Sequence, residues 1–123
     1  MLMTDHTGGK SRSSDYRYAM DAEQVSPGSA TPVEIDGRWY AVCNEGGRFY
    51  ACDNLCPHAG GPLGRGEIDD GRVICPIHHW PWDLKTGLTD PDMPWMRLKL
   101  YRCKLREGKV YVDVSAPIPP KPM

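Results

Sequence analysis

The sequence lacks any run of apolar residues approaching the roughly 20 that cross a bilayer. Residues 1–17 also hold no apolar core of the kind that a secretory signal needs. Neither sign of charge predominates, because 15 Lys and Arg nearly balance 16 Asp and Glu, which gives a net charge of −1. That balance argues against a nucleic-acid surface, which is normally strongly basic. We therefore expect a cytoplasmic protein of one domain, with neither membrane nor nucleic-acid contact.

Cysteine and histidine are few, and most of them fall in one stretch. The five Cys are an odd number, so a disulfide framework would leave one thiol over. Without a secretory signal, reduced thiols or metal ligands are the better interpretation. Residues 54–87 contain C-x-H at Cys56 and His58, followed by C-x2-H at Cys75 and His78.

The rest of the chain has the pattern of short β-strands separated by Gly-containing turns. Apolar and polar residues alternate on both sides of Asp-Gly pairs, a strong hairpin signal. We expect turns at 36–37, 45–47, 70–71 and 107–108. The only helix candidate is a short turn over 21–25, and residues 96–106 are expected to form one long strand. This pattern predicts an all-β fold, an antiparallel sandwich or barrel.

Composition divides the chain into three parts. Residues 1–15 are polar and are expected to form a flexible N-terminal arm. Residues 116–123 are a Pro-rich tail. The domain spans 16–115 and carries its Cys and His in two Pro- and Gly-rich loops, the first over 54–64 and the second over 75–87.

The two loops offer the ligands of a metal centre. Pro57 and Pro76 stiffen the chain directly after each Cys. Two thiolates and two imidazoles suit either Zn²⁺ or an iron–sulfur centre. Zinc sites usually pair like ligands, as C-x2-4-C and H-x3-5-H. Here each loop supplies one Cys and one His, which has a simple rationale in a two-metal cluster, with both Cys on one metal and both His on the other.

The stretches CPHAGGPLGRGEI and CPIHHWPWDLKTG resemble a Rieske [2Fe–2S] protein, and the similarity extends over roughly residues 16–114. The resemblance implies three stacked antiparallel sheets with a small cluster-binding subdomain. It also implies one [2Fe–2S] cluster, with Cys56 and Cys75 on the buried iron and His58 and His78 on the outer iron. Such a cluster is about neutral when oxidised, so it accepts an electron more readily than a four-Cys cluster.

The resemblance is to the low-potential branch of this family. Rieske proteins of quinol-oxidising complexes carry an extra Cys in each loop, joined as a disulfide, where this chain has Gly61 and Ile77. They also carry Ser and Tyr hydroxyls where this chain has Trp80 and Trp82. Fewer hydrogen bonds to the cluster imply a lower potential, roughly −150 to 0 mV.

The chain is therefore expected to be an electron carrier and not itself an enzyme. Only His6 and His79 remain beyond the predicted ligands, too few for the second iron site of a Rieske oxygenase. The chain resembles ferredoxins that pass one electron from a flavoprotein reductase to a terminal oxygenase. A small non-catalytic subunit of an NADH-dependent nitrite reductase is the alternative, and a structural zinc module is a third possibility.

Two further expectations concern residues beside the ligands. The strand pattern around Cys52 predicts a core thiol, as for Cys43 and Cys103, although C-x3-C with Cys56 could be a ligand pair. His79 stands where the family most often has Gly, so its backbone is expected to adopt a conformation that favours glycine.

Overall fold

The computed structural model describes residues 15–120, so residues 1–14 of the predicted arm and residues 121–123 of the tail lie outside the described part. No helix within it is long and apolar enough to span a membrane. Two short 3₁₀ turns occur, η2 (Ala22–Gln24), where a helical turn was predicted, and η3 (Leu63–Arg65). The strands are β1 (Tyr16–Asp21), β2 (Ser29–Ile35), β3 (Arg38–Glu45), β4 (Arg48–Asp53), β5 (Glu67–Asp69), β6 (Arg72–Ile74), β7 (Pro81–Asp83), β8 (Leu100–Tyr101), β9 (Cys103–Arg106) and β10 (Lys109–Asp113).

In three hairpins the two strands are connected by a tight turn. At Asp36–Gly37, Asp70–Gly71 and Glu107–Gly108 the first residue has φ of 51–52° and the Gly has φ of 75–84°. Two successive positive φ angles match the turn whose twist suits adjacent antiparallel strands. The Gly46–Gly47 turn between β3 and β4 also has two positive φ angles. The predicted turns are thus confirmed.

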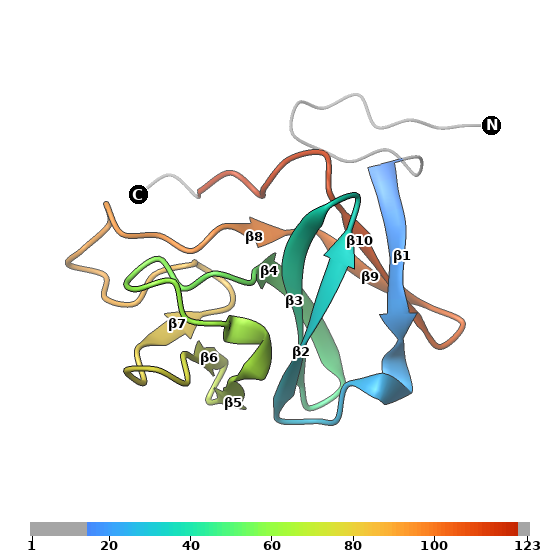
Figure 1. The fold of residues 1–123 in the computed structure, drawn as a ribbon, viewed down its shortest axis with the longest axis horizontal. Helices are drawn as coiled ribbons and strands as arrows, with labels where there is room; N and C mark the ends of the chain where they lie inside the picture. Colours follow the sequence, from blue (N-terminus) through green and yellow to red (C-terminus); the bar gives the residue numbers. More distant parts are fainter. Residues whose placement is uncertain (1–14, 121–123) are drawn as a thin grey trace.

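All strand pairs are antiparallel, and the predicted all-β class is confirmed (Figure 1). One sheet has the order β1-β10-β9, and the other has the order β7-β6-β5-β2-β3-β4-β8. The small β5–β6–β7 ladder joins the larger sheet through a single residue pair, Ser29 with Glu67. That ladder therefore forms a nearly separate third layer, which carries the second loop (Figure 1).

The predicted single strand over 96–106 is wrong. The chain forms β8 in the larger sheet and β9 in the smaller one, and the strands are separated at Arg102. Tyr101 pairs with Ala51 of β4, whereas Cys103 pairs with Val112 of β10. An alternating pattern cannot reveal this change of partner, because both sheets bury alternate side chains.

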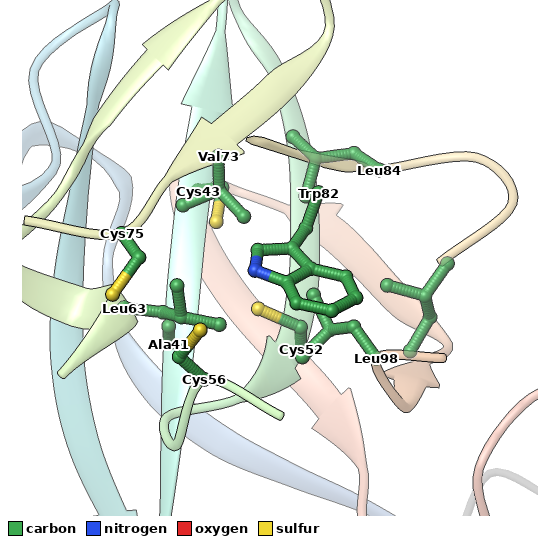
Figure 2. Close-up of a cluster of buried hydrophobic side chains, with 11 residues drawn as sticks. Ala41, Cys43, Cys52, Cys56, Leu63, Val73, Cys75, Trp82, Leu84 and Leu98 are labelled. Carbon is green, nitrogen blue, oxygen red and sulfur yellow. The ribbon is translucent and has the colours of Figure 1, made fainter. Parts of the chain in front are cut away.

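Two clusters of buried side chains form the core. One lies between the sheets and includes Tyr40, Val42, Tyr101 and Val110. The other lies at the end that carries the two loops and is centred on Trp82 (Figure 2). The second cluster packs the Cys side chains of both loops, so folding of the core and placement of the loops are coupled.

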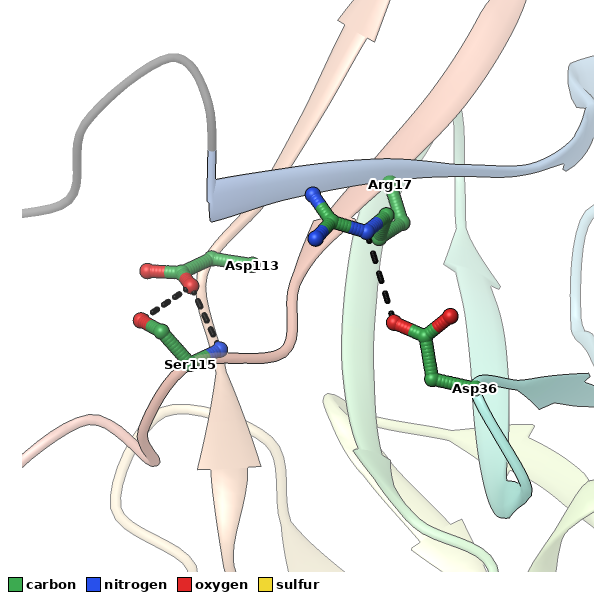
Figure 3. Close-up of polar contacts among 4 residues, drawn as sticks. All are labelled: Arg17, Asp36, Asp113 and Ser115. Carbon is green, nitrogen blue, oxygen red and sulfur yellow. Dashed lines mark hydrogen bonds and ion pairs between the residues drawn. The ribbon is translucent and has the colours of Figure 1, made fainter.

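Polar contacts hold the chain in place near the ends of several strands (Figure 3). Arg17 Nε of β1 lies 3.3 Å from Asp36 Oδ2 in the β2–β3 turn. The buried carboxylate of Asp113 accepts hydrogen bonds from the Ser115 backbone N–H at 2.8 Å and from its hydroxyl at 2.6 Å. The Ile118 N–H donates to the Leu100 carbonyl at 2.7 Å, so this part of the Pro-rich tail lies along β8.

Candidate metal centre

The first loop is closed by its own backbone. The Cys56 N–H donates to the Gly61 carbonyl at 2.8 Å, and the Gly60 N–H donates to the Cys56 carbonyl at 2.7 Å. Asn54 holds the base of the loop, because its side-chain oxygen accepts from the Gly64 N–H at 2.8 Å. The loop is thus a rigid turn that starts at the end of β4 and returns into η3.

The second loop repeats this hydrogen-bond pattern. The Cys75 N–H donates to the Trp80 carbonyl at 2.9 Å, and the His79 N–H donates to the Cys75 carbonyl at 2.8 Å. The loop is held at its base by strands β6 and β7, where Ile74 pairs with Pro81. Strand β7 could not be predicted from the sequence, because a three-residue strand that begins with Pro gives little pattern.

The shared pattern explains the unusual backbone of His79. In each loop the residue four positions after Cys donates back to that Cys, and in the first loop this residue is Gly60, with φ of 76°. In the second loop it is His79, with φ of 62°. The prediction that His79 adopts a backbone conformation favouring glycine is confirmed.

Burial separates the four predicted ligands into two pairs. Cys56 and Cys75 are 3% and 1% exposed, whereas His58 and His78 are exposed. The two imidazole rings meet edge to face, with centroids 5.3 Å apart and planes at 74°. Figure 2 shows the two thiols at one end of the buried cluster, beside Leu63. The structure therefore brings the two imidazoles together at the surface and places the two thiols in the buried cluster beneath the loops.

Trp80 makes a contact that the sequence did not reveal. Its ring stacks on the His58 imidazole with centroids 3.7 Å apart and an interplanar angle of only 10°. The stack holds one face of the imidazole and leaves its edges available. No spacing rule links Trp80 to His58, since the two lie in different loops.

The two loops approach each other most closely at Gly61. A Cβ placed there would lie 2.6 Å from Cys75 Sγ and 2.7 Å from Ile77 Cγ1, both too close. Only a residue without a side chain allows the two loops to approach this closely.

Cysteines at positions 61 and 77 are expected to join the loops by a disulfide. A Cβ at 61 would lie 3.4 Å from the Ile77 Cβ, just below the range of disulfide-bonded pairs, about 3.5–4.5 Å. The loops would also have to separate enough to relieve the 2.6 Å contact between this Cβ and Cys75 Sγ. That displacement offsets part of the gain from cross-linking, so the oxidised Gly61→Cys/Ile77→Cys variant should be stabilised by no more than about 2 kcal/mol. It should also show no more free thiols than the parent in a denaturing, non-reducing thiol assay, and two additional thiols would contradict the expected pairing.

Residues 15–102 match the Rieske [2Fe-2S] domain family. The chain belongs to this family. It is 32% identical over 101 residues to the biphenyl dioxygenase ferredoxin subunit of Pseudomonas sp. (strain KKS102), covering 81% of this chain and 93% of the relative.

Two solved structures are similar to this Rieske chain in fold. One is a chain in the complex of reduced oxygenase and oxidised ferredoxin of carbazole 1,9a-dioxygenase, with a TM-score of 0.72, 26% identity and coverage of 82% of this chain and 94% of that one. The other is assigned as the small subunit of an NADH-dependent nitrite reductase from Mycobacterium tuberculosis. It has a TM-score of 0.70, 25% identity and coverage of 79% and 92%.

The donor set of this Rieske domain fits a single [2Fe–2S] cluster. Each iron of a mixed-ligand cluster needs only two protein ligands, two thiolates on one and two imidazoles on the other. Within residues 15–120, no three Cys, His, Asp or Glu side chains gather as they would around one ion. The observed division into buried thiols and exposed imidazoles matches the two-plus-two requirement.

The remaining cysteines lie in the core of the domain. Cys43 and Cys52 are fully buried, which confirms the prediction of core thiols. A hydrogen bond with Cys43 and burial raise the pKa of the Cys52 thiol well above its usual range. Cys103 is partly buried, and burial raises the pKa of its thiol to about 12. Cys52 and Cys103 are thus neutral thiols near pH 7, and neither is a ready thiolate ligand.

Proposed function

We propose that this Rieske chain is a one-electron carrier, which accepts an electron from a flavoprotein reductase and delivers it to a terminal oxygenase. The observation that carries the proposal is the arrangement of two buried thiols and two exposed, mutually contacting imidazoles on paired rigid loops. When bound, a [2Fe–2S] cluster supplies a site that gains and loses one electron.

Each protein group has a distinct part in this assignment. The Cys56 and Cys75 thiolates would bind the inner iron, and the imidazoles of His58 and His78 would bind the outer iron. Pro-stiffened loops and their internal hydrogen bonds keep the four donors in place when the charge of the centre changes. Small reorganisation of this kind favours rapid electron transfer. Trp80 would hold the orientation of the His58 ring through its stacked contact.

The docking surface would be the tip formed by the two loops. Pro57, Ala59 and Gly60 are exposed there, and their small size allows a partner to approach the exposed edges of the imidazoles. Trp95, in the neighbouring segment 90–95, is 74% exposed and adds apolar area. A small, transient interface suits an electron shuttle. The ferredoxin complex of carbazole dioxygenase supports an oxygenase as one partner.

Stopped-flow spectroscopy tests the carrier function. The purified coloured protein should be reduced by NADH and a catalytic amount of a dioxygenase-system flavoprotein reductase, and it should then be reoxidised by a Rieske terminal oxygenase. A colourless protein that contains zinc would overturn the assignment of the centre. A coloured protein that exchanges no electrons with either partner would overturn the carrier function.

A small subunit of an NADH-dependent nitrite reductase is the second candidate, because the Mycobacterium tuberculosis chain is as similar in fold as the carbazole dioxygenase structure. The two candidates differ in how firmly they bind partners. A carrier should elute alone in size-exclusion chromatography. A subunit should elute in a fixed ratio with a larger catalytic chain when the two are produced together.

The midpoint potential is expected to be roughly −150 to 0 mV, the lower part of the Rieske range. The chain has Trp80 and Trp82 where high-potential relatives have Ser and Tyr hydroxyl donors, so it lacks two O–H donors to the reduced cluster, which an indole N–H would replace only in part. Protein-film voltammetry near pH 7 measures this value. A potential above about +200 mV would contradict the low-potential assignment.

A further inference from the structure

Trp82 is buried at the centre of the core cluster beside the loops. It is 0% exposed and lies in β7, opposite Val73 of β6. This pairing places it in the same hairpin as Cys75. Its indole Nε1 is buried and has no hydrogen-bond partner among the described residues. A buried donor without an acceptor destabilises a protein, and a phenylalanine would fill apolar space without this penalty.

The surroundings of the indole restrict its possible acceptors. Apart from Trp82, the buried members of the cluster are hydrocarbon side chains and four cysteines, and Tyr50 and Met96 are among the partly buried residues packed against it. Figure 2 shows the nitrogen-bearing edge of the indole turned away from Leu84 and Leu98 and toward the side where all four cysteines lie, with Cys43 and Cys52 drawn nearer to it and Cys56 and Cys75 beyond them. Among the buried side chains of the cluster, sulfur is the only possible acceptor.

The cysteine sulfurs differ as acceptors. The Cys52 thiol has a raised pKa, because it is hydrogen-bonded with Cys43 and buried, so it remains neutral and accepts weakly. Thiolates that bind iron carry negative charge, and hydrogen bonds to charged acceptors are roughly twice as strong as neutral ones. The acceptor that Trp82 lacks is therefore best supplied from the side of Cys56 and Cys75.

We propose that the Trp82 Nε1–H donates a hydrogen bond to a sulfur atom of the bound cluster, either a cysteine thiolate or a bridging sulfide. This inference rests on the proposed function, because it requires the cluster. Trp82 is then a positioning and tuning residue, not a ligand. One-electron reduction makes the cluster more negative, so the N–H stabilises the reduced state more than the oxidised state and raises the potential.

Trp82→Phe tests the proposal, with Trp39→Phe as the matched control because Trp39 is 53% exposed and lies on β3. We expect the equilibrium constant for one-electron reduction of the cluster to be about tenfold lower in Trp82→Phe, which corresponds to a midpoint potential about 59 mV lower. The control should keep the parental potential. An unchanged potential in Trp82→Phe, with the cluster retained, would overturn the proposal.

A second measurement covers the case in which Trp82→Phe fails to fold or to retain the cluster. Pulsed EPR of the reduced protein, with ¹⁵N in its tryptophan indoles, should detect a weak ¹⁵N coupling to the unpaired electron. That coupling should persist in Trp39→Phe and also in Trp80→Phe, which removes the other labelled indole near the centre, the one stacked on His58; its loss in Trp80→Phe would assign the coupling to Trp80 and overturn the proposal. Its absence from the labelled parent would overturn the proposal. Neither result touches the carrier function, which fails only if the protein holds no iron–sulfur cluster or exchanges no electrons with its partners.

Discussion

His78→Ala is expected to abolish cluster binding, whereas His79→Gly should retain a full cluster. Loss of one of two imidazoles leaves the outer iron with an incomplete ligand set at an exposed position. His79 instead occupies the position equivalent to Gly60, and it has the same positive φ. Iron and sulfide content and the visible absorption spectrum of the purified variants measure the difference.

His79→Gly is the matched control, because it changes the adjacent histidine in the same loop. Glycine removes the strain of the left-handed backbone in the folded protein, but it also gives the unfolded chain more conformational freedom. These two effects oppose each other, so the free energy of unfolding should change by less than about 1 kcal/mol. If His79→Gly lost the cluster and His78→Ala kept it, the ligand assignment would be wrong.

Gly66→Ala is expected to have the largest effect on stability. A Cβ at this position would clash with the carbonyl oxygen of Ile74, a backbone atom that cannot rotate away. Gly66 ends η3, and Ile74 directly precedes Cys75, so the clash would displace the strands that support the second loop. We expect a loss of about 3 kcal/mol or more, and a Tm lower by more than about 10 °C.

Gly46→Ala is the control for Gly66→Ala. Gly46 lies in the turn between β3 and β4, and its φ of 60° makes alanine somewhat strained, but a Cβ there would meet nothing within 4 Å. The expected loss is about 1 kcal/mol. Thermal unfolding followed by circular dichroism compares the two variants. Equal losses would mean that steric contact with Ile74 does not determine the stability of this region.

The ligand spacing and the hairpin turns could be predicted because both are local properties. C-x-H and C-x2-H place their donors within one tight loop each, and the positive φ of residues such as Asp36 and Gly37 follows from a two-residue turn. The backbone of His79 was predictable for the same reason, since the loop itself requires a left-handed residue at that position.

Other features depended on contacts between segments that are distant in sequence. The break between β8 and β9 follows from pairing with β4 on one side and β10 on the other. The stack of Trp80 on His58 joins two different loops, and the close approach of Gly61 to Ile77 does the same. No local pattern specifies which neighbour such residues will meet.

By itself, the sequence determined the family, the four candidate ligands and the all-β class, because these depend on residue types at short spacings. Only the tertiary structure decided that the two cysteines are buried while the two histidines are exposed, and that the Trp82 N–H lies beside the cysteines without a partner. Burial and hydrogen-bond satisfaction are properties of the packed core, where each side chain is surrounded by residues from several strands.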